Sequence, residues 1–318
     1  MSLKRKVVAN EPPSASKKPK VDFFAPRAAG KVTPSTSTSN ASFTFKPKSA
    51  TCVRLTTWNI NGIMSVDEKI LKKYLEAEDP DILILTETKY SKGKPNIINL
   101  SKYQYWGVDP RAGHAGTAIL SKFKPLKTII GLPSWEESSG RYVELEFEEA
   151  FVVGTYAPNS GDKFKTMDLK EKWNTALNLH LQELNSAKPV IWGGDFNTIM
   201  EKKDLDDTAR KFWNEMSGLS EQERAGFRKI LQPDDSKNPA FVDAWRHSHT
   251  EADEYTFHAP KFGSWRLDSF ITSSSLIDKV ESCVIRNELK DLKQSDHWPV
   301  TMDIILDLCP KVDSGKEL

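Results

Sequence analysis

The chain of 318 residues contains only three cysteines, Cys52, Cys283 and Cys309, and none of them forms a CxxC pair. So sparse and odd a set excludes a disulfide framework, argues against a zinc site and is typical of a reducing compartment. No apolar run approaches the roughly 18 residues that a membrane-spanning helix needs. The segment after Lys4-Arg5-Lys6 lacks the apolar stretch of a secretory signal. These absences predict a globular protein without a membrane partner.

The formal net charge of +1 hides an uneven distribution of charge. Residues 1–50 hold ten Lys or Arg against two Asp or Glu, a charge of +8, and the remaining residues hold 35 against 42, a charge of −7. A net-acidic domain that binds a polyanion must gather its basic groups on one face or hold a divalent metal in an acidic cleft. Bulk charge alone therefore does not indicate a nucleic-acid partner.

Residues 1–50 have the composition of a disordered tail, with Ser, Thr, Pro and Ala runs and few large apolar residues. Two basic clusters in it, Lys4-Arg5-Lys6 and Lys17-Lys18-Pro19-Lys20, are separated by ten residues. They resemble a bipartite nuclear-import signal, which predicts a nuclear protein with an import receptor as a partner. The alternative is a solvated basic tail that contacts phosphates loosely.

From Val53 onward, short apolar runs bounded by turn residues predict β-strands. The predicted strands are Val53–Trp58, Ile82–Leu85, Thr117–Leu120, Tyr142–Phe147, Phe151–Tyr156, Val190–Trp192, Leu267–Ile271 and Val300–Ile305. Helices lie between these strands. Strands and helices that alternate in this way predict an α/β sandwich of two sheets in one domain, residues 51–318.

Three helices are predicted from end signals and periodicity. The first begins at Ser65, where Glu68 completes a capping box, and the third spans Ser220–Leu231 with a second capping box. The second spans about Met167–Leu184 and has a broad apolar stripe. The stripe consists of Leu169, Trp173, Leu177, Leu179, Leu181 and Leu184.

Polar residues follow or precede several of the predicted strands, which is where α/β proteins build rigid sites. The segments are Trp58–Gly62, Leu85–Lys89, Tyr156–Asn159, Gly193–Asn197 and Ser295–Pro299. Each alone reads equally well as a turn or a helix cap. Together they supply carboxylates, amides, a phenol and an imidazole, and no serine or cysteine nucleophile motif. Hard oxygen ligands suit Mg²⁺ or Mn²⁺, and the imidazole and amides suit the oxygens of a phosphodiester, so this set indicates phosphoryl transfer.

The ordered motifs WNING, LTETK, YAPNSG, GGDFNT, WRLDSF and SDHWP resemble the exonuclease III family of abasic-site endonucleases, within the endonuclease/exonuclease/phosphatase superfamily. The likeness spans residues 53–308 and is strongest to the eukaryotic nuclear members. It implies a four-layered α/β sandwich with the site at one rim of the two sheets. It also implies a DNA repair enzyme, acting as a monomer, that hydrolyses the phosphodiester 5′ to abasic sites in duplex DNA, with accessory 3′-phosphodiesterase and 3′–5′ exonuclease activity.

The resemblance also implies a metal site for Mg²⁺, with Mn²⁺ as a possible substitute. Glu87 matches the family's metal-ligand glutamate, with Asn61 and Asp296 as further members of the metal environment and Asp195 and Asn197 adjoining it. Asn61 replaces an aspartate found in some relatives. We therefore expect metal binding to survive with a weaker charge.

The catalytic roles carry over in the same way. Asp195 matches the aspartate that orients or deprotonates the attacking water, helped by Asn197. Asp268 is expected to pair with His297 and to keep the imidazole protonated, because a neighbouring carboxylate raises a histidine pKa. Phosphate oxygens are expected to be held by Asn59, Asn159 and Tyr156.

Substrate choice is expected to follow from Phe257, Trp265 and Leu267, which match the family's apolar pocket for an extruded sugar without a base. An abasic nucleotide is the easiest to flip because no base pair is lost. The alternative is that these three residues are ordinary core side chains.

Three departures from the eukaryotic pattern affect other properties. Asp162 stands where those members have an arginine that wedges into DNA, with Lys163 or Lys165 as partial substitutes. The loop that holds Lys261-Phe262 is shorter than in the animal enzymes, which changes a second wedge. Thr56 stands where vertebrate members have a cysteine linked to transcription-factor reduction, so we expect that redox role to be absent.

Two other functions are compatible with parts of the pattern. Another phosphoesterase of the superfamily, such as a nonspecific DNase, a deadenylase or a phosphoinositide phosphatase, would share the carboxylates, amides and SDHxP motif. Trp265-Arg266-Leu267-Asp268 with Phe257 favours the abasic pocket instead. A non-catalytic chromatin-binding module would have no need of an intact set of catalytic side chains.

Overall fold

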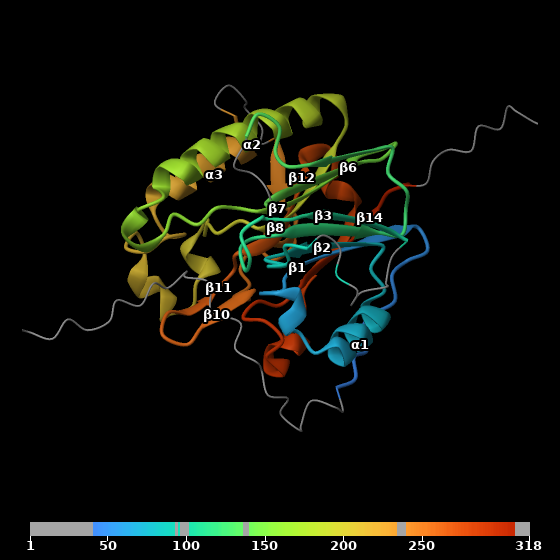
Figure 1. Ribbon diagram of the computed structural model, residues 1–318, viewed down its shortest axis with the longest axis horizontal. Helices are drawn as coiled ribbons and strands as arrows, with labels where there is room; N and C mark the ends of the chain where they lie inside the picture. The colour runs from blue at the N-terminus through green and yellow to red at the C-terminus, as the bar shows by residue number, and fades with distance from the viewer. Residues whose placement is uncertain (1–40, 93–94, 96–101, 136–139, 234–239, 309–318) are drawn as a thin grey trace, which may run out of the picture.

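Two six-stranded β-sheets lie face to face in this computed structural model, which describes residues 41–92, 95, 102–135, 140–233 and 240–308 (Figure 1). In spatial order, the first sheet consists of β13 (Val280–Ile285), β14 (Val300–Ile305), β1 (Cys52–Asn59), β2 (Ile82–Thr86), β4 (Thr117–Ser121) and β3 (Tyr103–Gly107). The second consists of β5 (Lys127–Ile130), β6 (Tyr142–Glu146), β7 (Phe151–Tyr156), β8 (Val190–Asp195), β12 (Asp268–Ser273) and β9 (Phe241–Asp243). Both sheets are mixed, because β1–β2 and β7–β8 are parallel and their neighbours antiparallel.

Helices cover the outer faces of both sheets (Figure 1). The α-helices are α1 (Glu68–Glu78), α2 (Met167–Ala187), α3 (Glu221–Leu231) and α4 (Ala244–Ser248). The short 3₁₀ helices are η2 (Ile63–Ser65), η4 (Asp162–Phe164), η5 (Lys202–Asp204), η6 (Ala209–Phe212), η7 (Ser274–Lys279) and η8 (Asn287–Leu292). A separate hairpin, β10 (Phe257–Ala259) and β11 (Gly263–Trp265), extends from one end. The predicted four-layered α/β sandwich is confirmed.

The inner faces of the sheets pack closely because two glycines in the second sheet carry no side chain. A Cβ atom at Gly154 would lie 2.8 Å from the Ile84 side chain of the first sheet, and one at Gly193 would lie 3.0 Å from the same side chain. Interior packing at this density has no room for an added methyl group. The close approach holds the ends of β7 and β8 against β2, where the polar residues lie.

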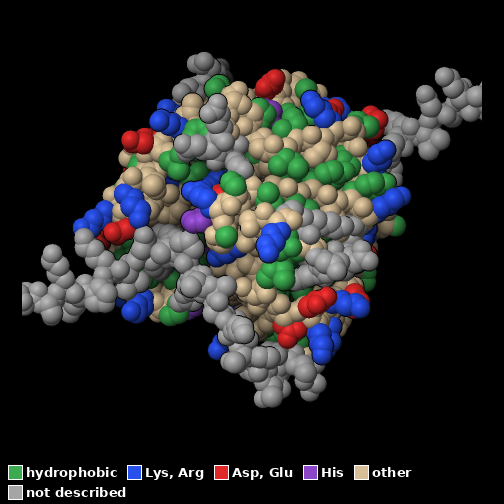
Figure 2. All heavy atoms as spheres, in the orientation of Figure 1, with side chains coloured by type: hydrophobic (Ala, Val, Ile, Leu, Met, Phe, Trp, Pro, Cys, Tyr) green, Lys and Arg blue, Asp and Glu red, His purple; other side chains and the backbone are tan. Residues whose placement is uncertain are grey.

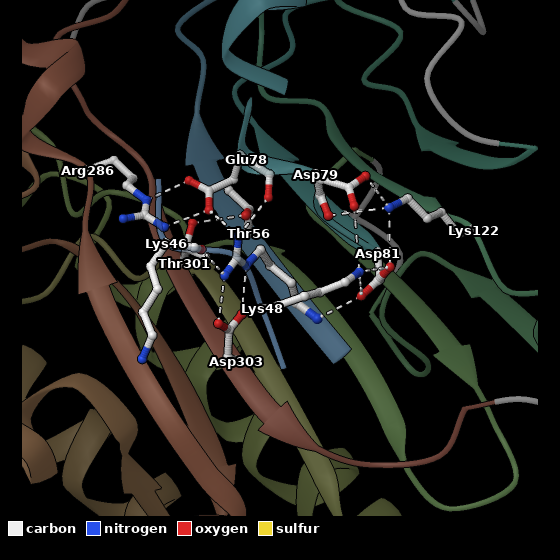
Figure 3. Close-up of polar contacts among 11 residues, drawn as sticks. Lys46, Lys48, Thr56, Glu78, Asp79, Asp81, Lys122, Arg286, Thr301 and Asp303 are labelled. Atoms are coloured by element: carbon white, nitrogen blue, oxygen red, sulfur yellow. Dashed lines mark hydrogen bonds and ion pairs between the residues drawn. The ribbon is translucent and has the colours of Figure 1, made fainter. Parts of the chain in front are cut away.

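Residues 41–50, which composition assigned to the tail, pack against the domain. The rings of Phe43 and Phe45 meet the Tyr74 ring of α1 edge-on at 5.8 and 5.9 Å. Arg54 of β1 donates to the main-chain carbonyl of Lys46 (3.0 Å). Lys48 pairs with the buried Asp81, and Asp303 pairs with the Arg54 guanidinium that contacts Lys46 (Figure 3). The packed part of the chain therefore includes residues before position 51, and residues 1–40, with both basic clusters, lie outside the described residues.

The structure corrects two details of the predicted helices. The N-cap of α1 is Asp67, whose carboxylate accepts bonds from Lys69 and Ile70, whereas Ser65 belongs to η2. Leu179 of the predicted stripe on α2 is 69% exposed, because only one face of this helix meets the sheet. The capping box of α3 is confirmed. Among the described residues, none of the helices has the length and apolarity to cross a membrane.

Candidate active site

The polar ends of five strands meet at one rim of the sandwich. β1 and β2 are parallel and end together, so Asn59 lies beside the residue that precedes Glu87. β7 and β8 are also parallel, with Tyr156 opposite Asp195. β12 is antiparallel to β8, which places its first residue, Asp268, opposite Asp195 as well. Sheet register thus brings together side chains that are far apart in the sequence.

Tight turns directly after the strands aim several of these side chains. Asn61, Glu87 and Asn197 all have left-handed backbone angles, with φ of 48°, 49° and 47°. Such angles are uncommon outside glycine and concentrate at functional sites. Gly194, one residue before Asp195, has φ of 146°, and a Cβ atom there would lie 1.9 Å from the carbonyl oxygen of Thr155. The second glycine of the GGDFNT motif is therefore required by the close pairing of β7 and β8.

Asn59 is fully buried at the centre of the site. Its Nδ2 donates to Oε1 of Glu87 (3.0 Å) and to Oδ2 of Asp195 (2.9 Å), and it lies 3.5 Å from Nε2 of His297. Glu87, Asp195 and His297 therefore point toward one another. Asn59 was predicted to hold a phosphate oxygen. Here its amide orients the three ionisable groups and does not face the cleft.

The predicted pairing of Asp268 with His297 is confirmed. Nδ1 of His297 lies 2.7 Å from Oδ2 of Asp268, and Thr256 Oγ1 donates to the same oxygen (2.7 Å). Burial alone would lower the pKa of His297. The negative charge and hydrogen bond of Asp268, with the charges of Asp195 and Asp296, outweigh burial and raise this pKa to about 10. The imidazole is therefore protonated at neutral pH.

The pKa of the buried Asp195 carboxyl group is higher than that of an ordinary exposed carboxyl group. Burial raises its pKa, the charge of Asp268 raises it further, His297 lowers it, and the resulting pKa is about 7. Its Oδ1 accepts a bond from the main-chain N–H of Asn197 (2.9 Å). A carboxylate whose pKa lies near the working pH is suited to take a proton from water.

Oxygen atoms suited to a cation converge beside this pair. Asn61 Nδ2 donates to Oδ1 of Asp296 (2.7 Å), which brings two of the predicted metal ligands together. The Lys89 ammonium lies 2.9 Å from Oε2 of Glu87 and also contacts Oδ1 of Asn61. Burial would raise the pKa of Glu87, but the charge of Lys89 lowers it below its usual value. The oxygen cluster already accommodates a cationic group, and hard oxygens of this kind are suited to a divalent metal ion.

A second group of possible ligands overlaps the catalytic pair. Asp195, Asp268 and His297 are all buried, and their ligand atoms lie within 4.8 Å of one another. Nδ1 of His297 is occupied by Asp268, however, and a protonated imidazole repels a metal ion. Of the two groups, the one around Glu87 is therefore the better cation site.

Three further predicted residues border the same space. The Tyr156 hydroxyl donates to Oε1 of Glu87 (2.8 Å), and burial together with the charge of Glu87 raises the Tyr156 pKa well above its usual value. The phenol therefore stays protonated. Asn159 Nδ2 lies 3.3 Å from Oδ1 of Asn197, whose own Nδ2 donates to the carbonyl of Ala157 (3.0 Å).

A cleft of about 650 Å³ opens over these groups. Phe257 and Leu267 form part of its wall, and the Phe257 ring lies 4.7 Å from the His297 imidazole. Trp265 is fully buried and is not a wall residue. It packs edge-on behind Phe257, with ring centroids 6.1 Å apart. The predicted apolar pocket thus has two residues at its surface and one beneath them.

The cleft also contains residues that sequence reasoning missed or left unassigned. Arg141 and His114 line it, and the Arg141 guanidinium lies 4.8 Å from the Tyr156 ring centroid. Lys261-Phe262 form the turn of the hairpin and lie on the wall, whereas Asp162 is exposed in η4. On the face of the molecule drawn in Figure 2, Lys and Arg side chains lie beside a histidine on the left half. The one sequence signal for Arg141 as a site residue is its position directly before the predicted strand Tyr142–Phe147.

Residues 56–297 match the Endonuclease/Exonuclease/phosphatase family. The chain belongs to this family. An exodeoxyribonuclease of Bacillus subtilis is 34% identical over 261 residues, which cover 79% of this chain and 99% of that protein. A DNA-(apurinic or apyrimidinic site) endonuclease of Dictyostelium discoideum is 30% identical over 268 residues, covering 80% of this chain and 71% of that protein.

Solved structures support the fold of this family member. The structure of an AP endonuclease from Archaeoglobus fulgidus matches with a TM-score of 0.68 at 22% identity, covering 80% of this chain and all of that one. The matched family region runs from Thr56 to His297 and so includes every residue of the rim described above.

Proposed function

We propose that this protein is a metal-dependent endonuclease that hydrolyses the phosphodiester 5′ to abasic sites in duplex DNA. The observation that carries the proposal is the pairing of Asp195, with a pKa of about 7, and a protonated His297 across one cleft with Phe257 in its wall. A base, an anion-stabilising cation and an apolar slot are what hydrolysis at a baseless sugar requires.

The chain's own residues account for the proton and charge movements. Asp195 accepts a proton as water attacks phosphorus, and Asn197 holds that carboxylate through its N–H. The P–O3′ bond breaks, the 3′ oxygen takes a proton from solvent water, and Asp195 returns its proton to solvent, so the products are a 3′-hydroxyl and a 5′-deoxyribose phosphate. The His297 imidazolium lies where negative charge grows on the phosphoryl oxygens. Tyr156 and Asn159 supply neutral donors at the same cleft.

A divalent metal ion would be held by Glu87, Asn61 and Asp296, and Mg²⁺ fits this oxygen set best, with Mn²⁺ as a substitute. When bound, it supplies positive charge to polarise the phosphoryl oxygens. Lys89 pairs with Glu87 in this structure, and with a cation bound at Glu87 this lysine would be available to an anionic oxygen in the cleft.

The wall of the cleft supports a preference for a sugar without a base. Phe257 and Leu267 have no polar atoms in their side chains that could hydrogen-bond to a base. Trp265 is buried behind Phe257 and packs against its ring, which keeps the wall rigid. The relative from Dictyostelium discoideum is named for apurinic or apyrimidinic sites, and the relative from Bacillus subtilis is named an exodeoxyribonuclease. These names support abasic incision as the main activity and 3′-end removal as an accessory one.

We also propose that the protein acts in base excision repair, that it does so in the nucleus, and that it is a monomer. The basic clusters at Lys4-Arg5-Lys6 and Lys17-Lys18-Pro19-Lys20 support import through a receptor. Replacing Lys4 and Lys6 by alanine in a fluorescent fusion should reduce nuclear accumulation and leave incision by the purified protein unchanged. Light scattering of the purified chain at micromolar concentration measures its mass directly, and a dimer would contradict the monomer.

An end-labelled duplex with one tetrahydrofuran abasic analogue tests the activity itself. We expect one 5′ incision with Mg²⁺, none with EDTA, and a loss of several orders of magnitude in Asp195→Ala with binding retained. Equal cleavage of an intact duplex would make the protein a general nuclease. Hydrolysis of RNA tails or phosphoinositides in its place would make it another phosphoesterase, and binding without any cleavage would make it a chromatin-binding module.

A further inference from the structure

A ring of buried polar side chains lies behind the cleft, between β8 and the two helices α2 and α3. Ser217 Oγ donates to Oδ1 of Asn159 (2.7 Å) and lies 2.6 Å from Oγ of Ser160. Asn159 contacts Asn197 through the 3.3 Å hydrogen bond described above. Glu223 lies on the far side of Ser160. Burial raises the pKa of the Glu223 carboxyl group, but the charge of Lys170 and several hydrogen bonds, one of them from Ser160, lower this pKa below its usual value.

Lys170 of α2 closes this ring. Its side chain is 1% exposed, its ammonium lies 3.1 Å from Oε1 of Glu223, and it donates to the main-chain carbonyl of Asn197. Glu223 in turn accepts bonds from the N–H of Gly218 (2.8 Å) and from the Ser220 hydroxyl (2.7 Å). A buried ammonium is costly unless it is paired and hydrogen-bonded, and here both conditions are met.

The carbonyl that Lys170 holds belongs to Asn197, which contacts both Asp195 and Asn159. Asn197 has a left-handed φ of 47°, a conformation that costs free energy for residues other than glycine and that asparagine tolerates better than most. In that conformation its N–H reaches Oδ1 of Asp195 (2.9 Å), and its side chain reaches Asn159. Lys170 itself is not a wall residue of the cleft, so it has no contact with substrate there.

We propose that Lys170 is a positioning residue. Through the carbonyl of Asn197, its buried ammonium keeps Asn197 in the conformation that orients Asp195 toward water and Asn159 toward phosphate. The proposal rests on the proposed function. It predicts that a residue outside the cleft controls the rate of the chemical step and not the binding of DNA, because a misplacement of about 1 Å at reacting groups costs on the order of 100-fold in rate.

Steady-state incision of the abasic duplex by the full chain tests this role. We expect Lys170→Met to lower kcat about 100-fold with KM changed less than about threefold. Affinity for the abasic duplex in EDTA should be unchanged. Lys170→Arg keeps a charged donor and should recover part of the lost kcat. Lys172→Met removes an exposed lysine of the same helix and should behave as wild type.

Two further variants separate positioning from folding. Lys170→Met with Glu223→Gln leaves no unpaired buried carboxylate and should fold, yet its kcat should stay low. Wild-type kcat in this double variant would overturn the proposal. In an Asn197→Ala background, Lys170→Met should cost much less than it does alone, and fully additive losses would also overturn it. A crystal structure of the double variant should show Asn197 outside the left-handed region, and an unchanged φ would contradict the proposal even in an inactive protein. Failure of the wild-type chain to incise abasic DNA would count against the proposed function instead.

Discussion

Nε1 of Trp58 donates a hydrogen bond of 3.1 Å to the main-chain carbonyl of His297, across 239 residues of sequence. Trp58 is 1% exposed and packs edge-on against Tyr74 of α1. The first strand of the domain therefore holds the loop that carries the imidazole. The position and the charge of His297 have separate sources, since Trp58 anchors its main chain and the Asp268 carboxylate keeps its ring protonated.

The pH dependence of incision should show two limbs. Asp195, with a pKa of about 7, acts as a base only when deprotonated, so kcat/KM should fall as the pH drops below about 7. His297, with a pKa of about 10, stabilises charge only when protonated, so the rate should fall as the pH rises through about 10. In Asp268→Asn the carboxylate that raises the His297 pKa is gone, and the alkaline limb should move to lower pH. An alkaline limb that stays in place would contradict the pairing.

Metal dependence should follow the oxygen cluster around Glu87. Glu87→Gln removes one negative charge and should raise the Mg²⁺ concentration for half-maximal incision at least roughly tenfold. Glu76→Gln, on the exposed face of α1, should leave that concentration unchanged. A metal titration of both variants measures the difference. Equal titration curves would move the metal to the Asp195, Asp268 and His297 group.

Selectivity for abasic DNA should depend on Phe257. Phe257→Ala opens the wall beside His297, so the ratio of kcat/KM for the abasic duplex to that for an intact duplex should fall. Trp265→Ala removes the support beneath and should instead lower the free energy of unfolding by about 3–5 kcal/mol. Competition assays and denaturant titrations distinguish the two effects. An unchanged ratio in Phe257→Ala would exclude a selective wall.

The packed N-terminal segment should stabilise the domain. A chain that begins at residue 51 loses Phe43, Phe45 and the ion pair of Lys48 with Asp81, and its free energy of unfolding should fall by at least about 2 kcal/mol. A chain that begins at residue 41 should unfold like the full chain. Denaturant titration compares them, and equal stability of the two shortened chains would contradict the packing.

The charge at position 162 should control the affinity of the protein for duplex DNA. Asp162 is exposed beside the cleft, and Asp162→Arg replaces a repelling charge with an attracting one. Duplex affinity should rise, and the slope of log affinity against log salt should steepen by about one. Product release should slow in consequence. Fluorescence anisotropy at several salt concentrations measures the slope, with Asp207→Arg as an exposed control at a different place.

Much of the site could be predicted because its motifs resemble those of a known family, which implied that Glu87, Asp195 and His297 share one site. The register of the parallel strands gives the physical reason, since it sets Asn59 beside the residue before Glu87 and Tyr156 beside Asp195. The sequence predicted Ser65 as the start of the first helix because Glu68 completes a capping box, but Asp is also a residue type that caps helices well. In the structure Asp67 is the cap, and its N–H donates to the side chain of Gln294 at 2.8 Å, a long-range contact that no local pattern predicts.

Lys170 shows the limit of local reasoning. A lysine in an amphipathic helix predicts a solvated side chain, and the two charged residues that follow it on α2, Glu171 and Lys172, are indeed exposed. Its burial is decided by Glu223, more than fifty residues later in the chain, through a 3.1 Å ion pair. Leu179 is the reverse case, since an apolar residue within a leucine-rich stripe points to solvent. Both depend on which face of α2 meets the second sheet.

The position of β14 between β13 and β1 has a consequence for how the protein is made. On the ribosome, Asn59 and Asp195 emerge long before the segment that carries the imidazole, and the first sheet cannot close without the strand that follows it. A nascent or prematurely terminated polypeptide therefore holds most of the chemical groups but never assembles them. The catalytic groups therefore come together only after the last strand of the first sheet has been made.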